Sequence, residues 1–287
     1  MRAPTLDILP RPIVYKTRGR GHGPIVRLMS PGDLGEALKP FVFLDLFGGP
    51  STFMGAMPLH PHSGIATITV ITEGDVRFDD PDSGSGTIDY GGVEWMRAGG
   101  GVWHGKEMSA GSSSTIKGFQ LWIALPAALE NGPVDSQYIE SRHIPAVGPA
   151  RLVVGRYGEA QSPVRSPDGL NYLLVTLKPG EAWTYTPPAG HQVAWLAVSH
   201  GSVGDAATGD MAVFKPGVDP IPLVGGPDGA TFVLASAVPH PHDLVTGYYS
   251  VHTSPEALEI GEANIQRLRA RLTVDPTAPG QVPVFKG

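Results

Sequence analysis

Short apolar segments separated by glycine turns limit the folds that are open to this chain. Residues 65–72 alternate along a run rich in β-branched side chains, Glu73-Gly74-Asp75 turns the chain, and residues 76–78 bring it back. Brief segments of this kind, joined by tight turns, are typical of β-hairpins. Glycine (38) and proline (29) recur throughout the 287 residues, and both favour turns. The sequence therefore predicts an all-β protein built from small barrels.

The hairpin pattern occurs twice. Residues 67–76 read TITVITEGDV and residues 194–203 read AWLAVSHGSV, so in both an apolar run enters a glycine turn and is followed by valine. Such repetition predicts two copies of one barrel, and 287 residues are enough for two domains. A polar, proline-containing segment lies between the copies and is typical of an interdomain crossing. We expect a first barrel over residues 1–140 and a second over residues 150–250.

The end of the sequence changes from strand to helix pattern. Ser254 is expected to cap a helix that has Pro255 at its first position. Leucine and isoleucine then recur at helical spacing, with arginines near the helix end, where cations suit the helix dipole. We expect one C-terminal helix, followed by a tail, over residues 254–287. Its apolar stripe should pack on a barrel.

Composition excludes several classes of function. The net charge of −6 disfavours direct binding to nucleic acid or to an anionic membrane. The absence of cysteine excludes disulfides, thiolate metal sites and cysteine nucleophiles. No apolar run is long enough to span a membrane, the first twelve residues lack the core of a secretory signal, and no nucleophile-elbow motif indicates a hydrolase. A cytoplasmic protein is expected.

The histidines of the segment LHPHSG, residues 59–64, are the most informative chemical feature. In an extended chain, residues two apart point to one side, so His60 and His62 should share a face. His104, which follows three consecutive glycines, is the third candidate ligand. Glu107 is the nearest carboxylate and the candidate fourth ligand. The alternative is that these histidines are exposed or hydrogen-bonded without a metal.

Three histidines and one carboxylate suit Fe(II), Mn(II), Ni(II), Cu(II) or Zn(II), and ligand type alone does not choose among them. Such a set leaves two positions open in an octahedral ion, as an oxygenase requires.

Other polar residues receive simpler interpretations. His191 is expected to be a satisfied polar residue, His200 to be exposed, the Pro239–His242 segment to be a loop, and Glu94 to face solvent.

A set of short motifs in the first half of the chain resembles the pirin family of the cupin superfamily. The motifs occur in this order: FVFLD at 41–45, HPHSG at 60–64, EG at 73–74, WM at 95–96, AGGGV at 98–102, His104, and GFQLW at 118–122. The resemblance implies two cupin barrels packed face to face. It also implies one metal ion, usually iron, held in the N-terminal barrel by His60, His62 and His104.

The resemblance implies one of two activities. Some pirins are quercetin 2,3-dioxygenases, which open the ring of a small aromatic flavonol with dioxygen and release carbon monoxide. In that case Glu107 would be the candidate catalytic carboxylate, with solvent as the alternative proton acceptor. Others are metal-dependent regulatory proteins that bind a protein partner without catalysis. A barrel that has lost its metal is a third interpretation.

Two positions depart from the family pattern. Pirins usually have His-x-Glu at the third histidine, whereas Glu107 lies one place later, and a bulge would be needed to restore the pattern. Pirins often carry a glutamate four residues after the second histidine, and this chain has Ala66 there.

Aligning the repeats places Pro187 and Ala189 opposite His60 and His62. The second barrel is therefore expected to bind no metal.

Overall fold

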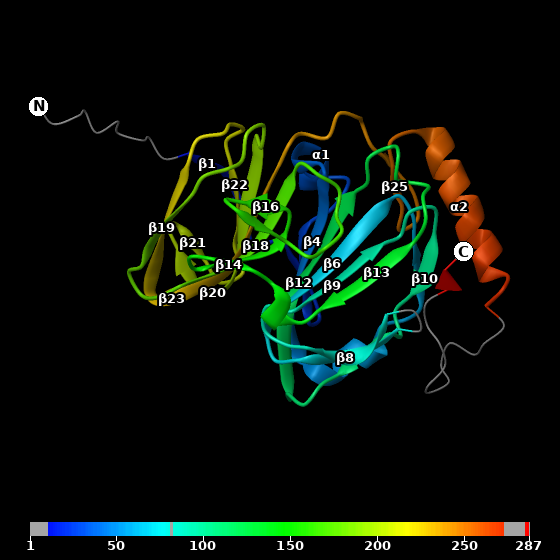
Figure 1. Ribbon diagram of the computed structural model, residues 1–287, viewed down its shortest axis with the longest axis horizontal. Coiled ribbons are helices and arrows are strands. Elements are labelled where there is room, and N and C mark those ends of the chain that lie inside the picture. The colour runs from blue at the N-terminus through cyan, green and yellow to red at the C-terminus, as the bar shows by residue number, and fades with distance from the viewer. Residues whose placement is uncertain (1–10, 81–82, 273–284, 287) are drawn as a thin grey trace, which may run out of the picture. The chain divides into compact units, whose positions relative to one another are not determined.

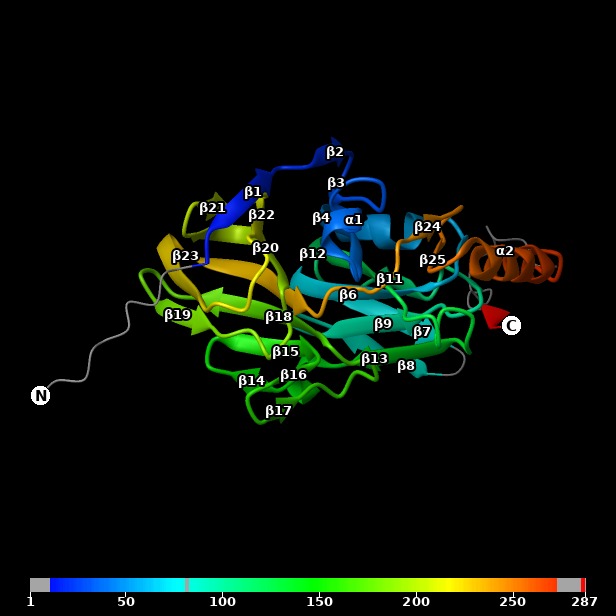
Figure 2. The same cartoon turned by 90° about the horizontal axis from the view of Figure 1, so that it is seen from above.

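The computed structural model describes residues 11–80, 83–272 and 285–286, and strands dominate it (Figures 1 and 2). The all-β prediction is confirmed. The chain forms two compact units, each gathered from separate segments. Unit 1 comprises Met1–Arg18, Ala146–Gln161 and Asp168–Pro239, and unit 2 comprises Gly19–Pro145, Ser162–Pro167 and His240–Gly287.

Each predicted domain is one continuous stretch of the chain. In the structure, by contrast, strand pairing brings segments that are distant in sequence into the same unit. The first described strand, β1 (Ile13–Thr17), pairs with β22 (Met211–Phe214) of unit 1. In unit 2, β25 (Val251–His252) follows a backbone bridge between Ser63 and Ser250. Unit 2 therefore contains a late segment of the chain beside the predicted ligands.

Unit 2 is built on a seven-stranded antiparallel sheet. In spatial order its strands are β13 (Asp135–Ile139), β9 (Val93–Arg97), β6 (Ile65–Glu73), β12 (Thr115–Ala124), β4 (Phe41–Pro50), β3 (Ile25–Met29) and β2 (Arg20–His22). The predicted strand over residues 65–72 is confirmed in β6. Because β6 pairs with β12 on one side and β9 on the other, nearly all its side chains are buried.

Smaller sheets and short helices complete unit 2. They are β11 (Met108–Ala110), β7 (Val76–Asp80) and β8 (Gly84–Ile88); β26 (Phe285–Lys286), β10 (Val102–His104) and β5 (His60–His62); β24 (Val245–Thr246) with β25; and α1 (Leu34–Leu38), η1 (Ser51–Ala56) and η2 (Ser141–His143). Phe47 and Ile71 of the large sheet pack with Val76 and Phe78 of β7 in one buried cluster. These apolar contacts hold the smaller sheet against the large one, and each fully buried side chain of this size contributes about 1.5–3 kcal/mol.

Unit 1 is a nine-stranded antiparallel sheet with its own apolar core. Its strands are β1, β22, β20 (Val193–Val203), β23 (Ile221–Ala237), β18 (Leu170–Leu177), β15 (Ala150–Val154), β14 (Ala146–Val147), β19 (Ala182–Tyr185) and β21 (Ala206–Ala207), with β16 (Arg156–Tyr157) and β17 (Ala160–Gln161) as a separate pair. His200 is exposed on β20, as expected. His191 is buried, and its Nδ1 lies 2.8 Å from Oγ of Ser236, which confirms a satisfied polar residue.

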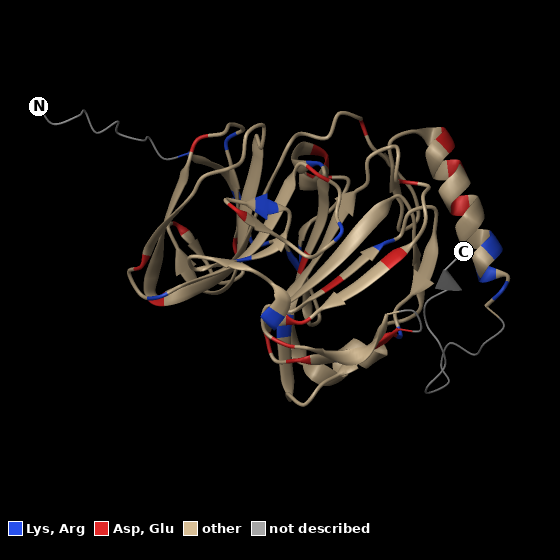
Figure 3. Ribbon diagram, in the orientation of Figure 1, with Lys and Arg blue, Asp and Glu red and all other residues tan. Residues whose placement is uncertain are grey.

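The predicted C-terminal helix is present as α2 (Pro255–Arg269). Ser254 caps it, since its Oγ accepts a hydrogen bond from the backbone N–H of Ala257 at 3.1 Å. Acidic residues lie toward its start and Arg267 and Arg269 in its last turn, as Figure 3 shows. Its buried side packs on β10, where Nε1 of Trp103 donates to the carbonyl of Ile265 at 2.9 Å.

Of the helix and tail predicted over residues 254–287, residues 273–284 and 287 lie outside the described residues. Among the residues that the structure does describe, neither α-helix has the length and apolar character required to cross a membrane.

Candidate metal centre

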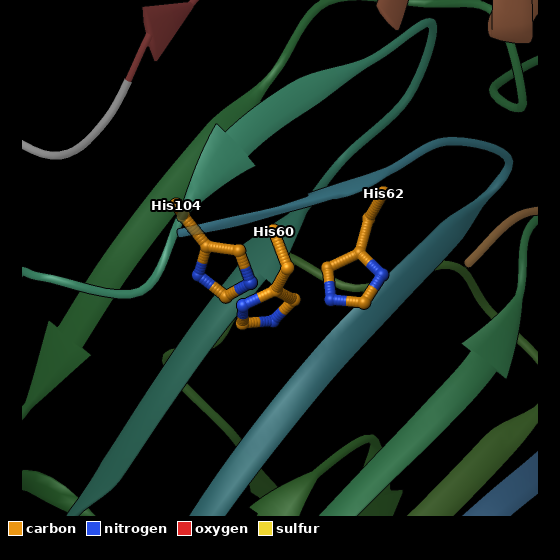
Figure 4. A group of neighbouring side chains, drawn as sticks. All are labelled: His60, His62 and His104. Atoms are coloured by element: carbon orange, nitrogen blue, oxygen red, sulfur yellow. The ribbon is translucent and has the colours of Figure 1, made fainter. Parts of the chain in front are cut away.

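Strands β5 and β10 bring the three predicted histidines together. The strands pair antiparallel, with His104 opposite His60 and Val102 opposite His62. Since side chains two apart in a strand share a face, His60 and His62 both lie on the side where His104 points. Figure 4 shows the three rings converging from the two strands. The predicted meeting of His60, His62 and His104 is confirmed.

The distances within the group suit one small ion. Each histidine offers one ring nitrogen, and these three atoms lie within 4.8 Å of one another. The ring centroids of His60 and His104 are 4.4 Å apart, those of His60 and His62 are 4.9 Å apart, and those of His62 and His104 are 5.0 Å apart. His62 and His104 are buried and His60 is half-buried.

Each imidazole is oriented through its Nδ1 atom. Nδ1 of His60 donates to the carbonyl of Pro58 at 2.9 Å, and Nδ1 of His62 donates to the carbonyl of Tyr249 at 3.1 Å. Nδ1 of His104 lies 2.7 Å from Oε1 of Glu107. A proton on Nδ1 leaves the Nε2 lone pair for a metal, which is how protein metal sites fix the histidine tautomer.

A buried atom without a partner supports this interpretation. Nε2 of His104 is buried and makes no hydrogen bond within the part of the chain that the structure describes. Leaving such a nitrogen unpaired is unfavourable. A divalent cation shared with His60 and His62 would satisfy it, so the donor set fits a metal ion.

Burial and neighbouring charges determine the protonation of the group. Burial lowers the pKa of His60 to about 4, assisted by the charge of His104, and lowers the pKa of His62 well below its usual value. Both rings are therefore neutral near pH 7, as metal ligands must be. Burial also acts to lower the pKa of His104, but the carboxylate of Glu107 outweighs it and the pKa is raised.

The structure places Glu107 behind His104 and outside the group of three nitrogens. The chain bends over residues 105–107, which accommodates the additional residue and turns Glu107 back. Its Oε2 accepts the backbone N–H of Gly105 at 2.7 Å and of Lys106 at 2.9 Å, while Oε1 faces His104. Although burial opposes ionisation, these partners lower the pKa of Glu107 to about 2. To become a ligand, it would have to leave them.

Gly105 makes this bend feasible. Its φ is +126°, and a Cβ there would lie 2.7 Å from the carbonyl oxygen of Pro58 and 3.1 Å from Nδ1 of His60. A side chain at this position would thus displace the first histidine. At Ala66, where the family pattern often has a glutamate, the buried methyl group supplies no carboxylate.

A pocket of about 240 Å³ opens beside the histidines within unit 2. Its walls come from the large sheet and from the smaller sheets that hold the histidines and Met108, so these sheets enclose it. It is mostly aromatic and aliphatic. The lining residues are Ile25, Arg27, Phe43, Asp45, Phe47, Phe53, Met54, Met57, His60, His62, His104, Gly105, Glu107, Met108, Gln120, Trp122 and Tyr249.

An aromatic stack forms one wall of the pocket. Phe43 of β4 and Trp122 of β12 are cross-strand partners whose rings lie 4.0 Å apart at 9°. The guanidinium of Arg27 lies 3.9 Å above the Phe43 ring. At the other end, Trp122 meets His62 edge-on at 4.8 Å. The stack therefore runs from a cation to a candidate ligand and presents flat apolar surface between them.

Asp45 and Arg27 are the charged pair of this pocket, and sequence reasoning did not assign them a role. Arg27 pairs with Asp45 across neighbouring strands, with Nη2 3.2 Å from Oδ2 and a second bond from Nε to Oδ1. Burial raises the pKa of Asp45, while Arg27 opposes the rise. The sequence could have indicated Asp45 through its spacing from Phe43: the two residues are two apart on β4 and must share a face.

The prediction that Glu94 faces solvent is wrong. Glu94 is 2% exposed, because β9 lies between two neighbouring strands and both of its faces are covered. Thr69 Oγ1 lies 2.7 Å from Oε2 of Glu94 and 2.8 Å from Oε1 of Gln120, which lines the pocket. Burial raises the pKa of Glu94 to about 7.

The remaining predicted histidines stay apart from the centre. His240 and His242 lie in the predicted loop, with His240 half-buried and His242 exposed. Nε2 of His240 is 3.4 Å from the carbonyl of Leu125. Neither belongs to the group of three nitrogens.

The two antiparallel β units and a three-histidine group able to bind a metal define a protein of the cupin class. Comparison with known proteins narrows this class. The family model for pirin matches residues 25–123. A pirin-like protein of Arabidopsis thaliana is 30% identical over 258 residues, which cover 82% of this chain and 81% of that protein. The chain belongs to the pirin family.

Two further proteins that resemble this chain are both named quercetin 2,3-dioxygenase. A Pseudomonas aeruginosa protein that carries the provisional name quercetin 2,3-dioxygenase is 32% identical over 204 residues, which cover 66% of this chain and 70% of that protein. The crystal structure of a quercetin 2,3-dioxygenase from Acinetobacter baumannii matches with a TM-score of 0.77 and 25% identity, over 92% of this chain and 99% of that one.

Proposed function

We propose that His60, His62 and His104 hold one divalent metal ion in a dioxygenase that acts on flavonol-like aromatics. The observation that carries the proposal is the common orientation of the three imidazoles, each tied to an oxygen through Nδ1. Iron(II) is the ion that we expect, although manganese, nickel, copper and zinc accept the same ligands. When bound, the ion would supply Lewis-acid and redox chemistry with open coordination positions.

The pocket supports a flat aromatic substrate. The Phe43–Trp122 stack offers a planar apolar surface that ends at His62. Rings of a flavonol would pack on it through offset or edge contacts. An apolar pocket with a few convergent polar groups is the usual form of a small-molecule site. The names of the Pseudomonas and Acinetobacter proteins support quercetin as the first substrate to test.

We assign to Asp45 the role of accepting the proton from the substrate hydroxyl. A flavonol hydroxyl has to lose its proton before the ring is opened, and Asp45 is the pocket carboxylate whose raised pKa makes it a suitable acceptor. Arg27 would stabilise the negative charge that remains. Glu107, predicted as a ligand and catalytic carboxylate, is proposed here as the residue that orients His104, because its oxygens are already bonded.

Oxygen uptake tests the proposal. The metal-free protein is loaded with Fe(II) under anaerobic conditions, and quercetin and dioxygen are then added. We expect dioxygen consumption matched by carbon monoxide release. A His62→Ala variant should show neither. An iron-replete protein that consumes no dioxygen would contradict the enzymatic proposal and would favour a metal-dependent regulatory protein instead.

A further inference from the structure

Tyr249 has an exceptional backbone conformation. Its φ is 58°, and among the described residues it is the one residue other than glycine with a positive φ. This region is sterically unfavourable for a side chain with a Cβ, and for a bulky residue it is rare. Such conformations persist where the surroundings hold them in place, and they concentrate at functional sites.

The conformation places two different parts of Tyr249 at the metal centre. Its carbonyl accepts the hydrogen bond from Nδ1 of His62 at 3.1 Å. Its ring lies 5.7 Å from the His60 ring, 5.8 Å from the His62 ring and 6.2 Å from the Trp122 ring, and it lines the pocket.

The residues on both sides of Tyr249 are fixed to the rest of unit 2. The backbone N–H of Tyr248 donates to Oε1 of Glu262 on α2 at 2.8 Å. The hydroxyl of Ser63, the residue after His62, donates to Oγ of Ser250 at 2.9 Å. The anchors on α2 and beside His62 therefore hold the segment in a conformation that Tyr249 would not adopt by itself.

We propose that Tyr249 is a positioning residue whose backbone carbonyl fixes the tautomer and orientation of His62, and whose ring closes one side of the substrate pocket. The inference rests on the proposed metal site. It assigns the backbone role and the ring role to one residue, and substitutions can separate them. If Tyr249 were only a turn residue, neither His62 nor the pocket would respond to the choice of side chain.

Three substitutions separate the two roles. Tyr249→Gly removes the ring but accommodates a positive φ, so the carbonyl stays in place. Tyr249→Pro removes the ring and fixes φ near −65°, which forces the carbonyl away from His62. Tyr249→Phe keeps both the ring and the backbone and is the matched control. If the proline variant does not fold by circular dichroism, Tyr249→Val, which disfavours positive φ, replaces it.

The first measurement is the affinity for Co(II), with the visible spectrum of the bound ion as a report on ligand geometry. We expect the phenylalanine and glycine variants to stay within about threefold of the wild type. The proline variant should lose about 10- to 100-fold, the usual effect of removing a partner of a ligating histidine. Equal affinities and spectra for glycine and proline variants would overturn the backbone role.

The second measurement works without metal. The ¹⁵N shifts of the His62 imidazole, assigned by comparison with His62→Gln, report which ring nitrogen carries the proton. The wild type and glycine variant should hold the proton on Nδ1, and the proline variant should not. If the wild type binds no Co(II), the proposed metal site fails, while this readout still decides the role of Tyr249.

The third measurement concerns the ring. Quenching of tryptophan fluorescence gives the affinity for quercetin in the metal-free protein. We expect about five- to tenfold weaker binding by the glycine variant and no change in the phenylalanine variant, which corresponds to about 1 kcal/mol. Equal quercetin affinity in the wild type and the glycine variant, or no binding by either, would overturn the pocket-wall role.

Discussion

Glu107 bonds to Nδ1 of His104 at 2.7 Å, which leaves Nε2 of the same ring as the atom available to the histidine group. The carboxylate is 3% exposed and also accepts two backbone N–H groups. A carboxylate behind a histidine raises the basicity of the ring and fixes its orientation. This contact explains how the three histidine nitrogens can still converge although the spacing between His104 and Glu107 is one residue longer than the usual family pattern.

Glu107→Gln should weaken metal binding without abolishing folding. The amide keeps the size of the side chain but loses the charge that holds the proton on Nδ1 of His104. We expect a loss of about 10- to 100-fold in Co(II) affinity by titration. Glu159→Gln, an exposed position in unit 1, is the control and should bind as the wild type does. An unchanged affinity for the Glu107 variant would contradict the orienting role.

Asp45→Asn should slow turnover while metal content stays the same. Asp45 lines the pocket and is the proposed proton acceptor, and removing a general base reduces the rate by about 10²- to 10⁴-fold. Oxygen uptake with quercetin and elemental analysis measure the two quantities. Asp79→Asn on β7, an exposed carboxylate, should leave both unchanged. A variant at Asp45 with full turnover would remove Asp45 from the mechanism.

His60 should make the unfolding free energy of the metal-free protein fall as the pH falls from about 6.5 to about 4, whereas Glu94, whose pKa is raised to about 7, acts in the opposite sense over this range. The pKa of His60 is lowered to about 4 by burial, and that of His62 is also lowered, so the unfolded chain binds protons at these two rings in this range before the folded chain does. We expect the contribution of His60, taken as the difference between the wild type and His60→Gln by urea denaturation, to be a loss on the order of 2 kcal/mol. His104, whose pKa is raised, acts in the opposite sense at higher pH.

His60→Gln provides the control for this pH dependence, because it removes a titrating ring whose pKa is depressed. As the pH falls over the same range, the variant should lose less unfolding free energy than the wild type, or gain more, because only Glu94 and the other groups still titrate. Identical slopes for the wild type and the variant would show that His60 is not held neutral by the fold.

Gly261→Ala should destabilise unit 2, although alanine normally stabilises a helix by about 1 kcal/mol over glycine. A Cβ at Gly261 would lie 2.6 Å from both Nε2 of His252 and Oγ of Ser63, which are themselves hydrogen-bonded at 2.9 Å. Overpacking of this kind costs about 1–3 kcal/mol. Thermal unfolding should show a lower midpoint, and a higher midpoint would contradict the close approach of α2.

The sequence allowed the histidine pair and the C-terminal helix to be predicted because both depend on local pattern. His60 and His62 share a face through strand alternation alone. Ser254 and Pro255 mark a helix start by capping chemistry, and the structure shows the cap. The β6–β7 hairpin followed from β-branched residues that end at a glycine turn.

Other parts of the centre depend on tertiary contacts that local pattern does not contain. Glu94 follows strand alternation but is buried, because a strand inside a sheet-enclosed unit has no solvent face. The turn of Glu107 toward His104 depends on a bend that Gly105 allows beside Pro58. The partner of His62 is a backbone carbonyl 187 positions along the chain, which carries no side-chain signature.

The metal content of the purified protein tests the central claim most directly. Elemental analysis of the wild type should find about one divalent ion per chain, and His104→Ala should reduce this to a small fraction, since one of three ligands is lost. His242→Ala, at an exposed histidine outside the group, should retain the full content. A wild-type protein that takes up no ion even after incubation with excess Fe(II) or Co(II), or a His104 variant that keeps it, would contradict the account.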